Sequence, residues 1–244
     1  MPKVQITPWW WVFGALAALL VVTSAVPLTV GGWAAGTIYL AVSSTLVSIG
    51  LRRRGATRFG PANMVTATRS ALVGVVCALV VTSFTRPVPA LLITALVVPA
   101  LLLDGVDGWV ARRTRSESAL GARFDMEVDA FLLLVLGVDV APLLGWWVLA
   151  IGLMRYAFVA AGWVLPWMRA QLPARYWRKV VTAACGIALV ASASRLAPLP
   201  VAVAVVVIAL CLLVESFGRD VVWLARSRRT AATVRQSYRT QTFL

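Results

Sequence analysis

The sequence contains no histidine and only nine acidic residues among 244. Without imidazole, the protein has no Ser-His-Asp triad, no histidine metal ligand and no histidine acid–base catalyst. Its three cysteines, Cys77, Cys185 and Cys211, stand singly in apolar stretches, without the Cys-x2-Cys spacing of zinc and redox sites. They are predicted to be small core residues. The chemistry of the chain is therefore expected to rest on carboxylates.

Charged residues are scarce, at 13% of the chain, whereas 61% of the residues are hydrophobic and the mean hydropathy is +0.87. This composition excludes an ordinary soluble domain. Apolar runs of about 20 residues are long enough to cross a bilayer as helices. Eight runs are predicted to be membrane spans, at residues 8–26, 30–50, 62–83, 88–112, 119–141, 145–165, 178–194 and 199–217. The expected fold is an all-α, polytopic transmembrane helical bundle.

The 23 basic residues give a formal net charge of +14. No nucleic-acid partner is expected, because these residues gather in short segments between the apolar runs. Nineteen of them fall in or beside one set of alternate loops, and the opposite loops hold only Arg86 and Arg195. By the positive-inside rule, the basic loops face the cytoplasm. The sequence predicts an integral protein of the cell membrane with both termini in the cytoplasm.

Each end of the chain has a feature of its own. The run at 8–26 has a weakly basic start, as a cleaved signal peptide does, but the tryptophans at 9–11 favour an interfacial anchor that is retained. The next run contains Gly32 and Gly36 in a GxxxG pattern, which favours close helix packing within one subunit. The polar, basic stretch 226–244 is expected to lie disordered on anionic lipid.

Four aspartates lie close together in this apolar chain: Asp104, Asp107, Asp125 and Asp129. A carboxylate inside a membrane costs about 2.5–3.5 kcal/mol on insertion scales, so four of them need a partner for their charge. The first two share one helical face, and so do the last two. A short basic loop joins the two spans, so all four carboxylates are expected to converge near the cytoplasmic surface. Such an oxygen cluster suits Mg²⁺ or Mn²⁺, with substrate phosphates completing the coordination shell.

Small and basic residues accompany the aspartates. Gly108 and Gly121 allow a bulky ligand to approach the helix backbones, and Arg112 can neutralise a phosphate. An acidic helix pair by itself is equally typical of an ion or proton pathway in a transporter and of a structural carboxylate–arginine network. The residue types alone leave these alternatives open.

The pattern D-x2-D-G-x2-A-R-x8-G-x3-D-x3-D is complete between Asp104 and Asp129. It resembles the signature of the CDP-alcohol phosphotransferase family, which are integral membrane enzymes of phospholipid synthesis. The resemblance implies a six-span catalytic core at 62–217. Residues 1–50 then form two extra N-terminal spans, residues 51–61 a basic cytoplasmic loop, and residues 218–244 a basic cytoplasmic tail.

The resemblance also implies roles for individual positions. Asp104, Asp107 and Asp125 are expected to bind the divalent metal that holds the CDP diphosphate. Asp129 is expected to share this metal site and to act as the general base that deprotonates the acceptor hydroxyl. The implied CDP pocket combines motif positions with the start of the first core span, namely Gly108, Ala111, Arg112, Gly121, Asn63, Thr66 and Arg69.

The implied reaction joins CDP-diacylglycerol, or a related CDP-lipid, to an alcohol or alcohol phosphate and releases CMP. It would be carried out by a homodimer among membrane lipids, with its site open to the cytoplasm. The main alternative is an ion-coupled transporter or channel. Transporters often contain internal repeats, but this acidic cluster occurs once. A third possibility, a non-catalytic lipid-binding scaffold, predicts that the aspartates tolerate asparagine.

The motif does not identify the acceptor alcohol. Four basic residues are candidates for binding it: Arg155, Arg123, Arg178 and Lys179. Family members that use phosphorylated acceptors often carry a basic residue directly after the fourth aspartate, where this chain has Ala130. That difference weighs against an acceptor phosphate, although another arginine can supply the charge. Glu127 is two residues from each flanking aspartate and is expected to be an interhelical or surface partner rather than a metal ligand.

Overall fold

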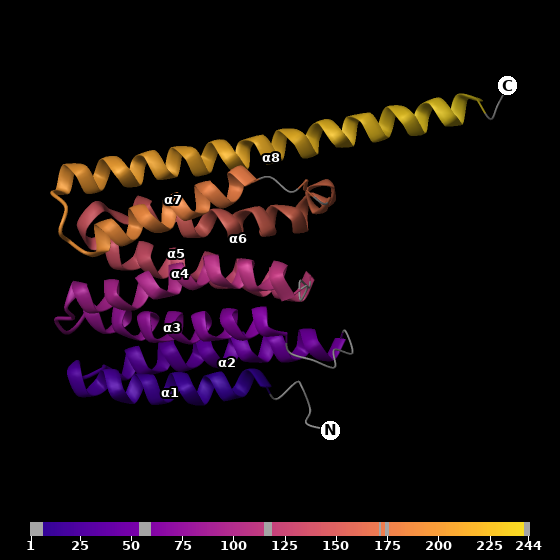
Figure 1. The fold of residues 1–244 in the computed structure, drawn as a ribbon. Coiled ribbons are helices and arrows are strands. Elements are labelled where there is room, and N and C mark those ends of the chain that lie inside the picture. The colour runs from indigo at the N-terminus through magenta and orange to yellow at the C-terminus, as the bar shows by residue number, and fades with distance from the viewer. Residues whose placement is uncertain (1–6, 54–59, 115–118, 171, 174–175, 242–244) are drawn as a thin grey trace.

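The computed structural model describes residues 7–53, 60–114, 119–170, 172–173 and 176–241. These residues form eight α-helices and two short 3-10 turns, with no β-strand among them (Figure 1). The helices are α1 (Thr7–Ala25), α2 (Val30–Arg53), α3 (Pro61–Ser83), α4 (Ala90–Thr114), α5 (Ala119–Leu144), α6 (Leu149–Val164), α7 (Tyr176–Ala193) and α8 (Leu199–Gln241). The turns are η2 (Trp146–Val148) and η3 (Pro166–Arg169). The predicted all-α bundle is confirmed.

Proline and glycine mark several helix ends. α3 begins at Pro61. Proline lacks a backbone N–H, and this costs nothing at the first position of a helix, where the N–H has no partner within the helix. α5 ends at Leu144, and Gly145 follows with φ 103°, a conformation that glycine adopts without steric strain. α6 ends before Pro166, which cannot continue a helical hydrogen-bond ladder. These breaks separate the apolar runs into successive antiparallel helices.

The helices run up and down, so each is antiparallel to the next along the chain (Figure 1). The start of α1 and the end of α8 therefore point to the same end of the bundle, where α4 also ends and α5 begins. α3 lies centrally and packs against α1, α2, α4 and α5. α5 in turn contacts α6 and α7. The junction of α3, α4 and α5 carries the aspartate motif at one end.

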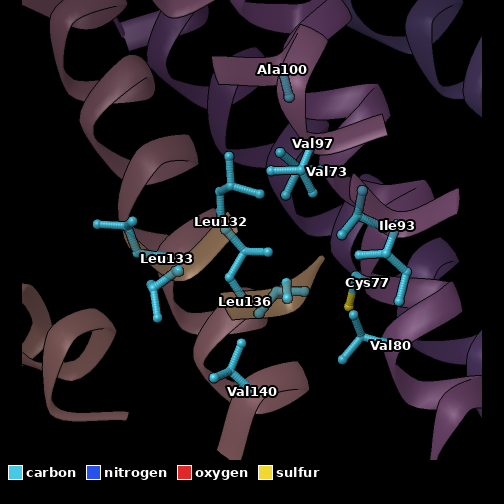
Figure 2. Close-up of a cluster of buried hydrophobic side chains, with 14 of the residues drawn as sticks. Val73, Cys77, Val80, Ile93, Val97, Ala100, Leu132, Leu133, Leu136 and Val140 are labelled. Carbon is cyan, nitrogen blue, oxygen red and sulfur yellow. The ribbon is translucent and has the colours of Figure 1, made fainter. Parts of the chain in front are cut away.

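The other half of this junction is an apolar core, drawn in Figure 2. Its labelled side chains come from all three helices, and they are Val73, Cys77, Val80, Ile93, Val97, Ala100, Leu132, Leu133, Leu136 and Val140. Burial of Cys77 here and of Cys185 in α7 confirms the prediction for these two cysteines. The prediction is wrong for Cys211, which is exposed on α8, because the outer face of a membrane helix also accommodates apolar side chains.

The GxxxG pattern packs α2 tightly on α3. A Cβ added at Gly32 would lie 2.6 Å from the carbonyl oxygen of Ala78. One added at Gly36 would lie 3.0 Å from the carbonyl oxygen of Gly74. Because a Cβ would clash with the α3 backbone at Gly32 and would be tighter than most contacts at Gly36, the pattern serves close packing within one subunit, as predicted.

Four helices in the described residues are long and apolar enough to cross a membrane by themselves, at Val30–Arg53, Asn63–Ser83, Trp146–Val164 and Leu199–Arg228. Shorter apolar stretches occur in α1 and α4, at Trp9–Ala25 and Ala90–Val106. α5 carries the acidic motif residues, and α7 is only 18 residues long. Passage of all eight helices through the bilayer stays a prediction.

The basic tail differs from expectation. α8 extends for 43 residues to Gln241 and projects well beyond the ends of the other helices (Figure 1). The prediction of a disordered stretch is therefore wrong for residues 226–241, and residues 242–244 lie outside the described residues. That stretch contains no glycine or proline to break the helix, and arginine, its most frequent residue, favours helix.

Candidate functional site

Three of the motif aspartates meet at the α4–α5 end of the bundle. Asp104 lies just past the middle of α4, and Asp125 and Asp129 lie in the first half of α5. One carboxylate oxygen from each residue lies within 4.8 Å of the other two. Their side chains are 44%, 32% and 24% exposed, respectively. This aspartate trio is therefore partly open, which leaves a path for a ligand.

The guanidinium of Arg69, on α3, binds all three aspartates of the trio. Its Nη1 lies 2.6 Å from Asp104 Oδ1. Its Nη2 lies 2.5 Å from Asp125 Oδ1 and 2.9 Å from Asp129 Oδ1. The arginine side chain itself is 0% exposed. Hydrogen bonds between charged groups in such a buried setting are strong, so Arg69 fixes three helices relative to one another.

The charge of this site is incompletely balanced by its described side chains. Three carboxylates against one guanidinium leave a formal charge of −2. A divalent cation would cancel it, and carboxylate oxygens are the donors that Mg²⁺ and Mn²⁺ prefer. Ligand oxygens on one Mg²⁺ lie about 3–4 Å apart, given Mg–O distances of about 2.0–2.1 Å. The oxygens of the trio are already near this spacing, so the residues fit such an ion.

Several other motif positions lie beside the trio in the chain. Gly121 is half-buried in the first turn of α5. The remaining four belong to the last turns of α4, and their side chains lie outside the described part of the structure: Asp107, Gly108, Ala111 and Arg112. Their predicted roles stay predictions.

The start of α3 presents a row of polar residues. Asn63 is half-buried, Thr66 is buried, and Arg69 follows at the same three-residue interval, so the three lie along one side of the helix. We expected all three to line a CDP pocket. In the structure Arg69 contacts the proposed metal ligands, and so it organises the carboxylates of the site.

Arg155, a predicted acceptor-binding residue, lies in α6 and pairs with Glu127 of α5. Its Nη2 is 2.7 Å from Glu127 Oε1. Glu127 is thus an interhelical partner, as predicted from its position off the aspartate face. The Nε of Arg155 is buried without a hydrogen-bond partner, so this arginine retains an unused donor.

The other acceptor candidates are on different parts of the surface. The Nη1 of Arg178 lies 3.2 Å from Oδ2 of the buried Asp220, so this arginine joins the start of α7 to α8. Its Nη2 donates a hydrogen bond to the carbonyl oxygen of Pro173. Lys179 and Arg123 have exposed side chains. The structure does not bring these three residues into the trio's hydrogen-bond network.

Two contacts were not foreseen from the sequence, namely the three-way pairing of Arg69 and the pair of Arg178 with Asp220. The sequence did contain a signal for the pairing of Arg69. An arginine within an apolar span needs a buried counter-charge, and the aspartates of the motif were the nearest acids to supply it. The second needed the packing of α7 on α8, which spacing along the chain does not give.

Comparison with known proteins agrees with the motif. The family model described as CDP-alcohol phosphatidyltransferase matches residues 59–225. This range takes in α3 to α7 and part of α8, and it leaves out α1 and α2. No curated protein and no solved structure matched the chain. Because the matched range covers more than half of the 244 residues and includes the whole aspartate motif, the chain belongs to the CDP-alcohol phosphatidyltransferase family.

Proposed function

We propose that the protein transfers a phosphatidyl group from CDP-diacylglycerol, or a related CDP-lipid, to an alcohol acceptor and releases CMP. Members of its family are divalent-metal-dependent transferases that move a phosphate-linked group from a CDP-alcohol. Apolar helices of bilayer length make this chain an integral membrane protein. The substrate, the released product and the metal requirement of this chain are our proposals.

The observation that carries the proposal is the aspartate trio held by Arg69. Asp104, Asp125 and Asp129 come from two helices, and a fully buried arginine from a third helix draws their carboxylates together. Three carboxylate oxygens within 4.8 Å of one another, at side chains that are 24–44% exposed, form an oxygen cluster that a ligand can reach. Such a cluster suits a divalent cation that also binds a diphosphate.

The proposed reaction is a displacement at phosphorus. The oxygen of the acceptor hydroxyl forms a bond to the lipid-side phosphorus, and the bond from that phosphorus to the bridging oxygen breaks. CMP leaves with the bridging oxygen, and Asp129 takes the hydroxyl proton. Since CMP is a good leaving group, positioning and charge neutralisation are the main tasks for the protein.

Mg²⁺ or Mn²⁺, when bound, would neutralise the diphosphate oxygens and the charge that develops on CMP. Asp104, Asp125 and Asp129 would hold it, together with Asp107. Arg112 is proposed to neutralise a phosphate. The CDP pocket is proposed to include Gly108, Ala111, Gly121, Asn63 and Thr66.

The acceptor is proposed to approach from the side of Arg155. Its unpartnered Nε offers a donor for an acceptor oxygen, although Glu127 already takes up Nη2. Arg123, Arg178 and Lys179 stay further candidates. The cytoplasmic orientation of the site and of both termini, and the homodimer, are also proposals.

The test is CMP release by the purified protein from CDP-diacylglycerol, with Mg²⁺ or Mn²⁺ and a panel of glycerol 3-phosphate, inositol 1-phosphate, inositol, serine and choline. We expect release with one acceptor and none after chelation. Asp125→Asn should abolish it. Asp139→Asn is the matched control, because Asp139 is a carboxylate on the same helix about 20 Å along the axis from Asp125.

A folded protein that releases no CMP with any acceptor, or one in which Asp125→Asn retains full activity, would contradict the proposal. In that case the ion-coupled transporter or the lipid-binding scaffold would explain the acidic helices better. Ion flux through reconstituted vesicles that is lost in Asp125→Asn would identify the transporter.

A further inference from the structure

The N-terminal pair, α1 and α2, lies outside the range matched by the family model, yet both helices pack against the site helix α3 (Figure 1). α2 also contacts α5, which carries two aspartates of the trio. Membrane helices associate through close packing and interhelical hydrogen bonds. The polar contacts of this pair lie next to Arg69 in α3, at the level of the trio.

The first of these contacts is a hydroxyl cluster between α2 and α3. The Oγ of Ser70 lies 3.1 Å from the hydroxyl oxygen of Tyr39 and 3.1 Å from the Oγ of Ser43. Ser70 is 5% exposed and directly follows Arg69 in the chain. Hydroxyl groups in an apolar interior must keep their hydrogen bonds, so the cluster fixes α2 at one register on α3.

The same tyrosine also reaches α5. Its ring stacks on the ring of Phe131, with centroids 4.3 Å apart and planes 11° from parallel. Phe131 comes two residues after Asp129 in α5. One side chain of α2 thus contacts both the helix that carries Arg69 and the helix that carries two of its partners.

α1 adds a further polar contact at this level. The indole Nε1 of Trp11 donates to the Oγ1 of Thr68, which precedes Arg69. Between these contacts lies a small recess lined by Trp11, Ser43, Ser70 and Phe124 among others. These polar contacts tie α1, as well as α2, to the segment of α3 around Arg69.

We propose that α1 and α2 brace the aspartate trio, and that Tyr39 is a positioning residue that holds Arg69 and Asp129 in register through Ser70 and Phe131. This inference rests on the proposed function in one respect, namely that the trio binds a divalent cation. Tyr39 touches neither the cation nor the substrate, and it acts through α3 and α5. The family core would then depend, in this chain, on two helices that the family model does not include.

The test is Mn²⁺ binding to the full-length protein in lipid nanodiscs, measured by electron paramagnetic resonance without substrate. Tyr39→Phe keeps the ring and removes only the hydroxyl. Partners that orient metal ligands typically change metal affinity by about 10–100-fold, and Tyr39 acts one step further away, so we expect a loss of about three- to tenfold. Ser70→Ala should give a similar loss, and the double variant should lose no more than the single ones.

Thr37→Val is the matched control. Thr37 lies on the same helix, but its hydroxyl bonds only to carbonyl oxygens of α2, those of Trp33 and Ala34. A second control, Thr29→Val, lies just before α2 and removes a contact with Thr82, at the opposite end of α3 from Arg69, together with the hydrogen bond that Thr29 Oγ1 accepts from Gly32 N–H. Both controls should bind Mn²⁺ as the unmodified protein does.

Asp125→Asn separates the two hypotheses. If Asp125→Asn leaves Mn²⁺ affinity unchanged, the metal site itself is refuted and the brace with it. If Asp125→Asn weakens binding but Tyr39→Phe and Ser70→Ala do not, the brace alone is refuted. An equal loss in Tyr39→Phe and Thr37→Val would also overturn it, because the effect would then not depend on the link to α3.

Discussion

The two halves of the α3–α4–α5 junction use the same helices for opposite purposes. In the half shown in Figure 2, apolar side chains such as Val73, Val97 and Leu136 are fully buried and leave no charge to balance. In the other half, Arg69 is buried against three carboxylates that stay partly exposed. The apolar half can be complete without any ligand. In the charged half, the described ion pairs set three carboxylates against one guanidinium, so we infer that the apolar half supplies rigidity and the charged half supplies chemistry.

The largest effect is expected at the reacting carboxylate. Asp129→Asn removes the proposed proton acceptor, and general-base catalysis typically contributes about 10²–10⁴-fold, so kcat should fall by that factor. Asp139→Asn, in the same helix, should change kcat by less than about threefold, because Asp139 lies about 15 Å from Asp129 along the helix axis. Initial rates of CMP release across acceptor concentrations measure both. Equal losses in the two variants would argue against a specific role for Asp129.

The second largest effect is expected on stability, when the buried Arg69 is replaced. Removing one partner of a buried ion pair costs about 3–5 kcal/mol, so Arg69→Gln should lower the free energy of unfolding by that amount. Arg155→Gln breaks a pair whose side chains are 29% and 50% exposed, and it should cost about 0–1 kcal/mol. Titration with a denaturing detergent measures the free energy of unfolding of both variants. Added Mg²⁺ should stabilise both variants, because both keep the proposed metal ligands, and the gain should be larger in Arg69→Gln, where the cation also replaces the lost positive charge.

The apolar half can be tested without touching the site. Leu136→Ala removes a fully buried side chain and should cost about 2–5 kcal/mol of unfolding free energy. Mn²⁺ affinity of the folded protein should stay within about twofold, because no ligand helix changes its charges. Leu102→Ala, at a side chain that is 67% exposed on α4, is the control and should be nearly neutral. A large loss of Mn²⁺ affinity in Leu136→Ala would show that the two halves are not separable.

The smallest effect is expected at the α5–α6 contact. A Cβ at Gly152 would lie 2.5 Å from the Cα of Leu134, so Gly152→Ala must push the two helices apart. Overpacking of this kind costs about 1–3 kcal/mol. Gly218→Ala, where nothing lies within 4 Å, should leave stability unchanged or raise it slightly. Thermal unfolding midpoints of the two variants give the comparison, and equal midpoints would refute the close contact.

Much of the fold was predictable because apolar length is a strong signal. The eight predicted runs correspond to the eight helices in the described residues, with boundaries that differ by a few residues except at the end of α8, which extends to Gln241 instead of ending near residue 217. Convergence of Asp104 with Asp125 and Asp129 also followed from helical spacing and one short loop. These inferences need only local geometry and the order of helices along the chain.

Other features depended on packing that spacing does not reveal. The sequence placed Arg69 among the residues of the CDP pocket but did not predict its ion pairs with the aspartates. Those contacts depend on how α3, α4 and α5 are rotated relative to one another, which spacing along the chain does not give. The length of α8 was missed because basic composition was taken to indicate disorder, although arginine favours helix. The links from α1 and α2 to α3 could not be foreseen, because serine, threonine and tyrosine carry no signature at a fixed spacing.

The length of α8 has a practical consequence for imaging this protein. At about 1.5 Å per residue its 43 residues extend for about 65 Å, more than twice the roughly 30 Å hydrocarbon thickness of a bilayer. A small protein buried in a detergent micelle offers few landmarks for particle alignment in cryo-electron microscopy. A compact helical domain fused in continuous helix to the C-terminal end of α8 would stand clear of the micelle, and its orientation would report that of the bundle.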